Sequence, residues 1–254
     1  MSDIESAARQ RVAADEAALR RTRKQVTLGD TFRAFWRYPS PWMIAGALIL
    51  TLTARIVVGD WRLGDLWGPV VLVALFPVLE WVVHVFVLHW RPRDVAGVTL
   101  DTLLARKHRE HHTDPRDVPL VFIPWQALVW VMIGYNTLAL LAFPRIGQAL
   151  SFMIAVAVLG LLYEWTHYLI HSDYKPRTRA YKAVWRNHRL HHYKNEHYWF
   201  TVTSTSTADR LFGTYPDPAT VETSPTAKDL HGGGASLTRS APRSAPRSAP
   251  RSAQ

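Results

Sequence analysis

Residues 147–170 read GQALSFMIAVAVLGLLYEWTHYLI, an apolar run that carries a histidine near its end. As a helix this run would be long enough to cross the hydrocarbon core of a bilayer, which is about 30 Å thick. Three further apolar runs of at least 19 residues lie at 41–59, 66–89 and 119–143. The sequence therefore predicts an all-α integral membrane protein with four transmembrane helices.

Arg55, Glu80 and Glu164 interrupt three of these runs, which leaves open the alternative that the runs are buried helices of a soluble protein. The charges between the runs favour the membrane. Eight Lys and Arg residues precede the first run, six lie between the second and third, and seven lie within 171–194. The other two loops carry one each, Arg62 and Arg145. This alternation follows the positive-inside rule.

The same alternation places both termini in the cytoplasm. The membrane would be the plasma membrane of a bacterium or the endoplasmic reticulum of a eukaryote. The net charge of +10 is then a feature of topology, and we expect no binding of nucleic acid. The absence of cysteine excludes thiolate zinc sites, a self-held iron–sulfur cluster and thiol catalysis.

Composition divides the chain into three parts. Residues 1–40 form a cytosolic N-terminal segment with an amphipathic helix over 4–25, and residues 41–215 form the membrane domain. From residue 216 the sequence is rich in Pro, Thr and Ser, and it ends in repeated Ser-Ala-Pro-Arg units. Segments of this kind bury too little apolar surface to fold, so we expect 216–254 to be a disordered tail.

Ten of the twelve histidines fall into four short boxes. Two boxes end apolar runs, and two have the pattern H-x-x-H-H. The boxes are His84 and His89; His108, His111 and His112; His167 and His171; His188, His191 and His192. Only His197 and His231 lie outside them. The predicted topology brings all four boxes to the cytoplasmic side, so we expect a cytosolic helical cap that holds a metal centre.

Helical spacing lets each H-x-x-H-H box direct three imidazoles toward one point. His84 and His89 are five residues apart and would diverge by about 140° on a straight helix. That pair requires either a distorted helix end or two different metals. Ten imidazoles exceed the needs of one metal, and two ions with roughly five nitrogens each would account for them.

Imidazole binds zinc, copper, iron and nickel alike, so the ligand type leaves the metal open. Iron is favoured because a site beside a bilayer faces aliphatic C–H bonds, whose oxidation needs O2 activation that redox-inert zinc cannot provide. Zinc could replace iron in a purified sample. We expect no catalytic side chain beyond the metal centre.

Metal-bound imidazoles usually donate their second N–H to an acceptor. The candidates for this role are acidic residues near the boxes: Glu80, Glu164, Asp101, Asp114 and Asp209. His197 is a further candidate, either for this role or for a place at the substrate mouth.

The four boxes, in this order and spacing, resemble those of the fatty acid hydroxylase superfamily, which includes sterol desaturases, C4-methyl oxidases and carotenoid hydroxylases. The similarity runs from about residue 66 to 215. It is closest to Scs7-like fatty acid 2-hydroxylases, on His191-His192-Tyr193-Lys194-Asn195, on Val202-Thr203-Ser204 and on the stretch 209–214. The resemblance implies a di-iron centre with the ten boxed histidines as ligands, and O2-dependent hydroxylation of a fatty acyl chain.

Fungal relatives carry an N-terminal b5-type cytochrome domain, but this sequence has no His-Pro-Gly-Gly haem motif. We therefore expect a separate electron donor, a cytochrome or a ferredoxin with its reductase. Three alternatives stay open. The first is a desaturase or hydroxylase of sterols or carotenoids, and the second is a non-catalytic membrane zinc or haem protein. The third, a cationic membrane adaptor, leaves the boxed histidines unexplained.

Overall fold

The computed structural model describes residues 26–232. Four helical segments in it are long and apolar enough to cross a membrane: Pro39–Val58, Leu63–Leu88, Val118–Ala142 and Ile146–His171. They coincide with the four expected runs. The expected helix over 4–25 lies outside the described residues, as does the end of the expected tail.

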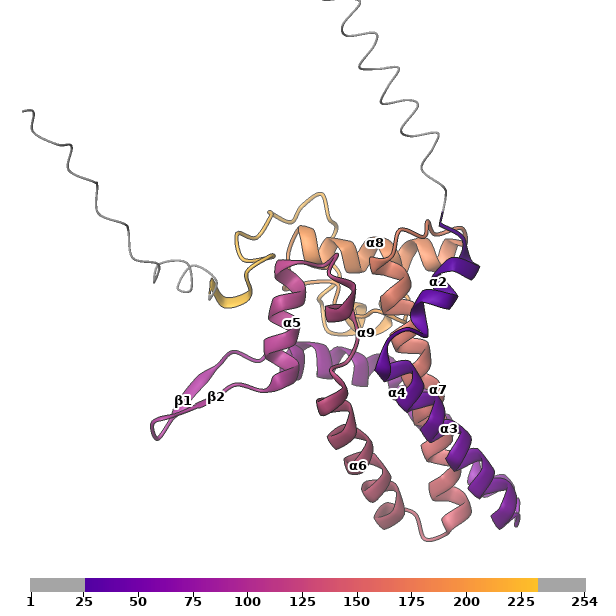
Figure 1. Ribbon diagram of the computed structural model, residues 1–254. Coiled ribbons are helices and arrows are strands. Elements are labelled where there is room, and N and C mark those ends of the chain that lie inside the picture. The colour runs from indigo at the N-terminus through magenta and orange to yellow at the C-terminus, as the bar shows by residue number, and fades with distance from the viewer. Residues whose placement is uncertain (1–25, 233–254) are drawn as a thin grey trace, which may run out of the picture.

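The described part is mostly helical (Figure 1). Its elements are α2 (Leu28–Phe35), α3 (Pro39–Val58), η1 (Leu63–Asp65), α4 (Trp67–Val82), the π-helical η2 (Val83–Leu88), β1 (Arg93–Val95), β2 (Val98–Leu100), α5 (Leu103–Thr113), η3 (Val118–Val121), α6 (Trp125–Ala142), α7 (Ile146–His171), α8 (Arg179–Tyr193), α9 (Thr207–Leu211) and η4 (Leu230–Gly232).

Helix α7 is the centre of the membrane domain and packs against α3, α4 and α6. Ile44 of α3, Leu128 of α6 and Ala157 of α7 form one buried cluster between three of these helices. The outer faces are apolar as well: Leu50, Val70 and Leu141 are 73%, 63% and 81% exposed. Broad exposed apolar surface is unfavourable in water and is what helices present to lipid.

Helices α5, α8 and α9 gather at one end of the four apolar helices (Figure 1). We call these three helices the helical cap. Two of them begin after a threonine at the N-cap, where the hydroxyl oxygen accepts a hydrogen bond from a free backbone N–H group of the first turn. Thr102 accepts from Ala105 N at 3.1 Å in α5, and Thr178 accepts from Tyr181 N at 3.2 Å in α8.

The far end of the helices holds a buried ionic cluster that explains the charge inside the first apolar run. Arg55 is completely buried, and its Nη2 lies 2.7 Å from Oδ2 of Asp65. Arg145 approaches the other oxygen of Asp65 at 2.6 Å. The guanidinium of Arg55 also lies over the Trp61 ring at 3.6 Å. A charge among apolar helices is tolerated when it is paired in this way.

One exposed antiparallel hairpin, β1–β2, departs from the expected all-helical fold. It joins η2 to α5 and projects from the molecule in Figure 1. Its turn residues Ala96 and Gly97 have φ values of 50° and 80°. Left-handed conformations at both central positions are typical of the tight turn that matches the twist of a hairpin.

The structure corrects the expected disorder from residue 216 onward, because 216–232 is ordered against the helical cap. We call this segment the C-terminal strap. Ala227 and Leu230 are 3% and 2% exposed, and Ser224 N donates to Lys194 O at 2.7 Å. The composition misled because hydrogen bonds to neighbouring loops, rather than a large apolar face, hold this segment in place.

Candidate metal centre

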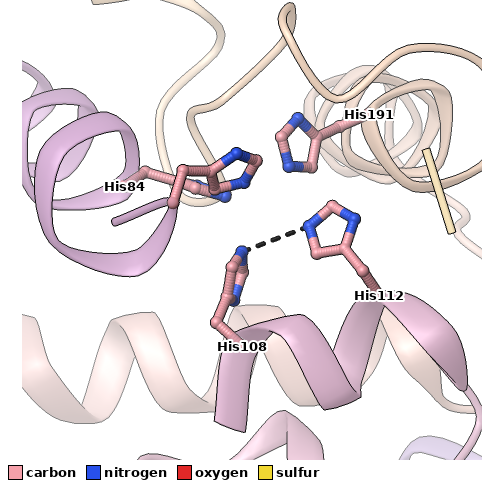
Figure 2. Close-up of side chains that lie close together, drawn as sticks. His84, His108, His112 and His191 are labelled. Atoms are coloured by element: carbon pink, nitrogen blue, oxygen red, sulfur yellow. Dashed lines mark hydrogen bonds between the residues drawn. The ribbon is translucent and has the colours of Figure 1, made fainter. Parts of the chain in front are cut away.

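The ten boxed histidines meet at the helical cap in two groups of five. In each group, one nitrogen per residue can be chosen so that all five lie within 4.8 Å of one another. We name each group after its first member within a membrane-spanning segment. The His84 group contains His84, His89, His108, His112 and His191; the His167 group contains His111, His167, His171, His188 and His192. Figure 2 shows four rings of the His84 group around one shared space.

A π-helical turn brings His84 and His89 together. Helix α4 passes into η2, and His89 N donates to His84 O at 3.0 Å, a bond between residues five apart. A π-helix joins residues i and i+5 by a hydrogen bond and so brings them closer in direction than an α-helix does, and the two ring centres lie 5.0 Å apart. Of the two alternatives that the spacing left open, the structure has the distorted helix end, and both residues belong to one group.

Each H-x-x-H-H box is divided between the groups, which corrects the expectation that its three imidazoles share one point. In α5, His108 and His112 join the His84 group and His111 joins the other. In α8 the pattern is reversed, since only His191 joins the His84 group. Adjacent helical residues point about 100° apart, so neighbouring histidines face the two groups on either side.

The nitrogen spacing in the His167 group fits a metal with octahedral-type coordination. Nε2 of His188 lies 3.1, 3.0 and 2.9 Å from Nε2 of His167, His171 and His192. Adjacent ligands of an octahedral ion would lie about 3.0 Å apart at metal–nitrogen distances of about 2.1 Å, and tetrahedral ligands about 3.4 Å. In the His84 group, Nε2 of His108 and His112 are 3.2 Å apart.

Buried ring nitrogens that face no protein partner support the same reading. Both nitrogens of His84 and the Nε2 atoms of His89 and His191 are buried without a hydrogen bond. Buried polar atoms are normally paired. A metal ion would satisfy one nitrogen of each of these rings, and the donor set of neutral imidazoles suits a transition metal.

Each imidazole has a second ring nitrogen that points away from the other histidines of its group. In four of the boxed histidines a backbone carbonyl, rather than an acidic side chain, binds this outer nitrogen. The Nδ1 atoms lie 2.8–2.9 Å from carbonyl oxygens, which can only accept, so Nδ1 carries the proton and Nε2 is free for a metal. The pairs are His112 with Ala227, His167 with Val121, His171 with Pro115 and His191 with Tyr198.

This arrangement corrects the expected direct contact between imidazole and carboxylate, which none of the acidic candidates makes within the described residues. Glu80 instead accepts from Val202 N and Thr203 N, both at 2.7 Å. Glu164 accepts from Ile123 N at 3.0 Å, two residues beyond the carbonyl that binds His167. These carboxylates therefore hold the loops beside the histidines.

Asp209 has the same role: it accepts from Phe200 N at 2.8 Å and Thr201 N at 3.0 Å, just after the Tyr198 carbonyl. Asp101 pairs with Arg109 at 2.6 Å, and Asp114 accepts from Arg116 N at 3.1 Å. The side chain of His197 is 71% exposed and lies 3.5 Å from Glu196.

Sequence reasoning missed Glu196, which is 2% exposed and binds the C-terminal strap through Ser224 and Thr226. An acidic residue four positions after the last boxed histidine was a usable signal. The carbonyl acceptors left no signal, since every residue has a carbonyl.

Burial keeps the cap histidines neutral. For the boxed histidines outside the spanning segments, burial in the first place and neighbouring imidazoles in the second hold the pKa well below its usual value. Neutral imidazole is the form that binds metal. The centre is therefore preorganised for ligation at neutral pH.

A small cavity of 40 Å³ lies beside one histidine of each group. It is lined by His108 and His167, by Lys107 and by apolar or aromatic side chains that include Leu104 and Phe122. Pockets that hold a small molecule have volumes of about 300–1,000 Å³, so this cavity marks a point where both groups can be approached and is not itself large enough for an acyl chain.

Comparisons with known proteins agree with this geometry. The sequence model of the fatty acid hydroxylase family matches residues 69–214. Two dihydroceramide fatty acyl 2-hydroxylases of Arabidopsis thaliana are 27% and 28% identical over 192 and 190 residues, which in each case is 73% of this chain and 75% of the relative.

The solved structure of full-length Scs7p, in which only the hydroxylase domain is visible, shares this fold with a TM-score of 0.58 at 21% identity. The match covers 75% of this chain and 69% of that one. The family model spans all four boxes and more than half of the sequence. The chain belongs to the fatty acid hydroxylase family.

Proposed function

We propose that this chain is an O2-dependent di-iron hydroxylase that inserts oxygen into a C–H bond of a fatty acyl chain in the membrane. The observation that carries this proposal is the pair of five-histidine groups at the end of four apolar helices, in a member of this family. The ten boxed histidines would hold the two irons, five to each.

The bound irons would supply O2 activation: with two electrons and two protons, one oxygen atom enters the C–H bond and the other leaves as water. The protein's own part is positional. The carbonyls of Val121, Pro115 and Tyr198 fix the orientation of three imidazoles. Burial of the rings keeps water away from the ligand nitrogens, which limits proton competition and side reactions.

The acyl chain would approach the centre at the small cavity between η2, α5, η3 and α7, which would have to widen to admit it. Leu104, Phe122 and Ile123 give this cavity an apolar wall, and Tyr163 lies on the α7 side. One histidine of each group lines this cavity, His108 from the His84 group and His167 from the His167 group. The names of the Arabidopsis relatives favour the acyl chain of a sphingoid lipid as substrate and carbon 2 as the position attacked.

The cap would face the cytosol, with both termini on the same side, because the basic loops adjoin it. Electrons would come from a separate cytochrome or ferredoxin with its reductase.

The test is lipid mass spectrometry on a host that expresses the chain with an electron donor, with iron measured in the purified protein. His167→Ala/His171→Ala removes two proposed ligands, and His197→Ala is the matched control because its side chain is exposed. We expect an acyl lipid to gain one oxygen with the parent and the control only. Loss of two hydrogens would overturn hydroxylation, and a haem spectrum or a zinc-only active protein would overturn the di-iron centre.

A further inference from the structure

We infer that the C-terminal strap, residues 216–232, is a positioning element for the His84 group, and that Glu196 fastens it in place. The inference rests on the proposed function only in taking the two histidine groups as metal sites. The strap lies beyond residues 69–214, which the family model matches, so it adds a part of the centre that the family pattern does not include.

The strap makes two hydrogen bonds to the His84 group. The Ala227 carbonyl accepts from His112 Nδ1 at 2.9 Å, and this pair is buried. Nε2 of His231 lies 3.1 Å from the carbonyl oxygen of His89, which can only accept. The first contact orients an imidazole directly, and the second holds the backbone at another member of the group.

Glu196 fixes the register of the strap. Its Oε1 accepts from Thr226 Oγ1 at 2.5 Å and from Ser224 Oγ at 3.0 Å. Thr226 directly precedes Ala227, so these bonds determine where the Ala227 carbonyl lies. The carboxylate is nearly completely buried, and a charged acceptor forms stronger hydrogen bonds than a neutral one.

The two groups depend on different segments for their outer contacts. In the His167 group, the carbonyls that bind His167 and His171 belong to Val121 and Pro115. Within the described residues, the strap makes no hydrogen bond to a histidine of that group. Loss of the strap should therefore weaken one metal site and spare the other. Loss of the hydrogen-bond acceptor of a metal-bound histidine typically lowers metal affinity by about 10- to 100-fold.

The experiment uses the full chain with the double substitution Ser224→Ala/Thr226→Val, which removes both hydroxyl donors to Glu196 with little change in volume. Thr220→Val is the matched control, because Thr220 lies in the same strap but its hydroxyl donates to Asp217 O. Thr226→Ser alone keeps both hydroxyl donors and should bind metal as the parent does. Metal content and chelator competition are measured in detergent, and product formation is measured separately on the same samples.

We expect the parent, Thr220→Val and Thr226→Ser to bind two metals. The double variant should retain one site at parental affinity and lose affinity at the other by about 10- to 100-fold. Unchanged affinity at both sites, or equal loss at both, would overturn the inference. A different result would separate this inference from the proposed function. If the parent binds two metals and the double variant loses affinity at one site only, but the parent forms no hydroxylated lipid, the proposed function fails while the role of the strap stands.

Discussion

Acidification below pH 6.5 should unfold the helical cap of the metal-free protein. Seven boxed histidines lie outside the spanning segments, and burial together with neighbouring imidazoles holds the pKa of each well below 6.5: His89, His108, His111, His112, His188, His191 and His192. In an unfolded cap these groups would titrate near 6.5. The unfolded state then binds more protons below that pH, so stability is complete above 6.5 and falls as the pH drops.

The size of the effect follows from the number of groups. Each such histidine costs up to about 1.4 kcal/mol of folding free energy per pH unit below its unfolded pKa. Seven of them cost about 10 kcal/mol at pH 5.5. Whole domains are stable by only about 5–15 kcal/mol. The cap should therefore open in a steep transition between about pH 6.5 and pH 5.

The absence of cysteine from the sequence permits a direct assay. Ala208, which is completely buried in α9, is replaced by cysteine and its labelling by a maleimide is followed against pH. Thr220→Cys is exposed in the folded protein and normalises the labelling rate at each pH. Bound metal competes with protons for the imidazoles, so the loaded protein should open at lower pH. An Ala208→Cys thiol that stays protected at pH 5 in the metal-free protein would refute the reasoning.

Three further predictions concern the membrane domain and the metal. Asp65→Asn should destabilise the protein by about 3–5 kcal/mol, because it leaves the Arg55 guanidinium buried without its carboxylate partner. Arg145→Gln should cost about 1 kcal/mol or less, because Arg145 is partly exposed. Thermal unfolding of the two variants in detergent should separate them, and equal shifts in Tm would contradict this ranking. Single cysteines that replace Leu63 and Thr220 should react with an impermeant maleimide from opposite sides of sealed vesicles, because the two positions lie near opposite ends of α7. Reaction from the same side would overturn the topology. The zinc-loaded protein should fold with two metals but form no hydroxylated lipid, because zinc is redox-inert, and product from it would exclude an iron-dependent reaction.

Sequence patterns predicted those features that depend on residues close together in the chain. Four apolar runs gave the spanning segments to within a few residues, because length and hydropathy are local properties. The spacing of His84 and His89 left either a distorted helix end or two different metals, and η2 is the distorted end. The same spacing rule could not divide each H-x-x-H-H box between two groups, because that division depends on how α5 and α8 face each other across the cap.

The supporting contacts were harder to predict for a different reason. The imidazole acceptors are main-chain carbonyls at Pro115, Val121, Tyr198 and Ala227, and a carbonyl has no residue signature. The conspicuous acids Glu80 and Asp209 bind loop N–H groups instead. The order of the C-terminal strap was missed because hydrophobic content was the criterion, whereas hydrogen bonds to Glu196 and Lys194 hold it.

The division of the boxes has a consequence for how the centre forms. Because α5 and α8 each send histidines to both groups, neither group is complete until these two helices have docked. The other four histidines come from η2 and the residue after it, His84 and His89, and from the last turns of α7, His167 and His171. Docking is therefore shared by the two sites, while their outer carbonyls come from separate segments. Loss of a cap helix should remove both metals, whereas loss of one carbonyl-bearing loop should weaken the group that it serves.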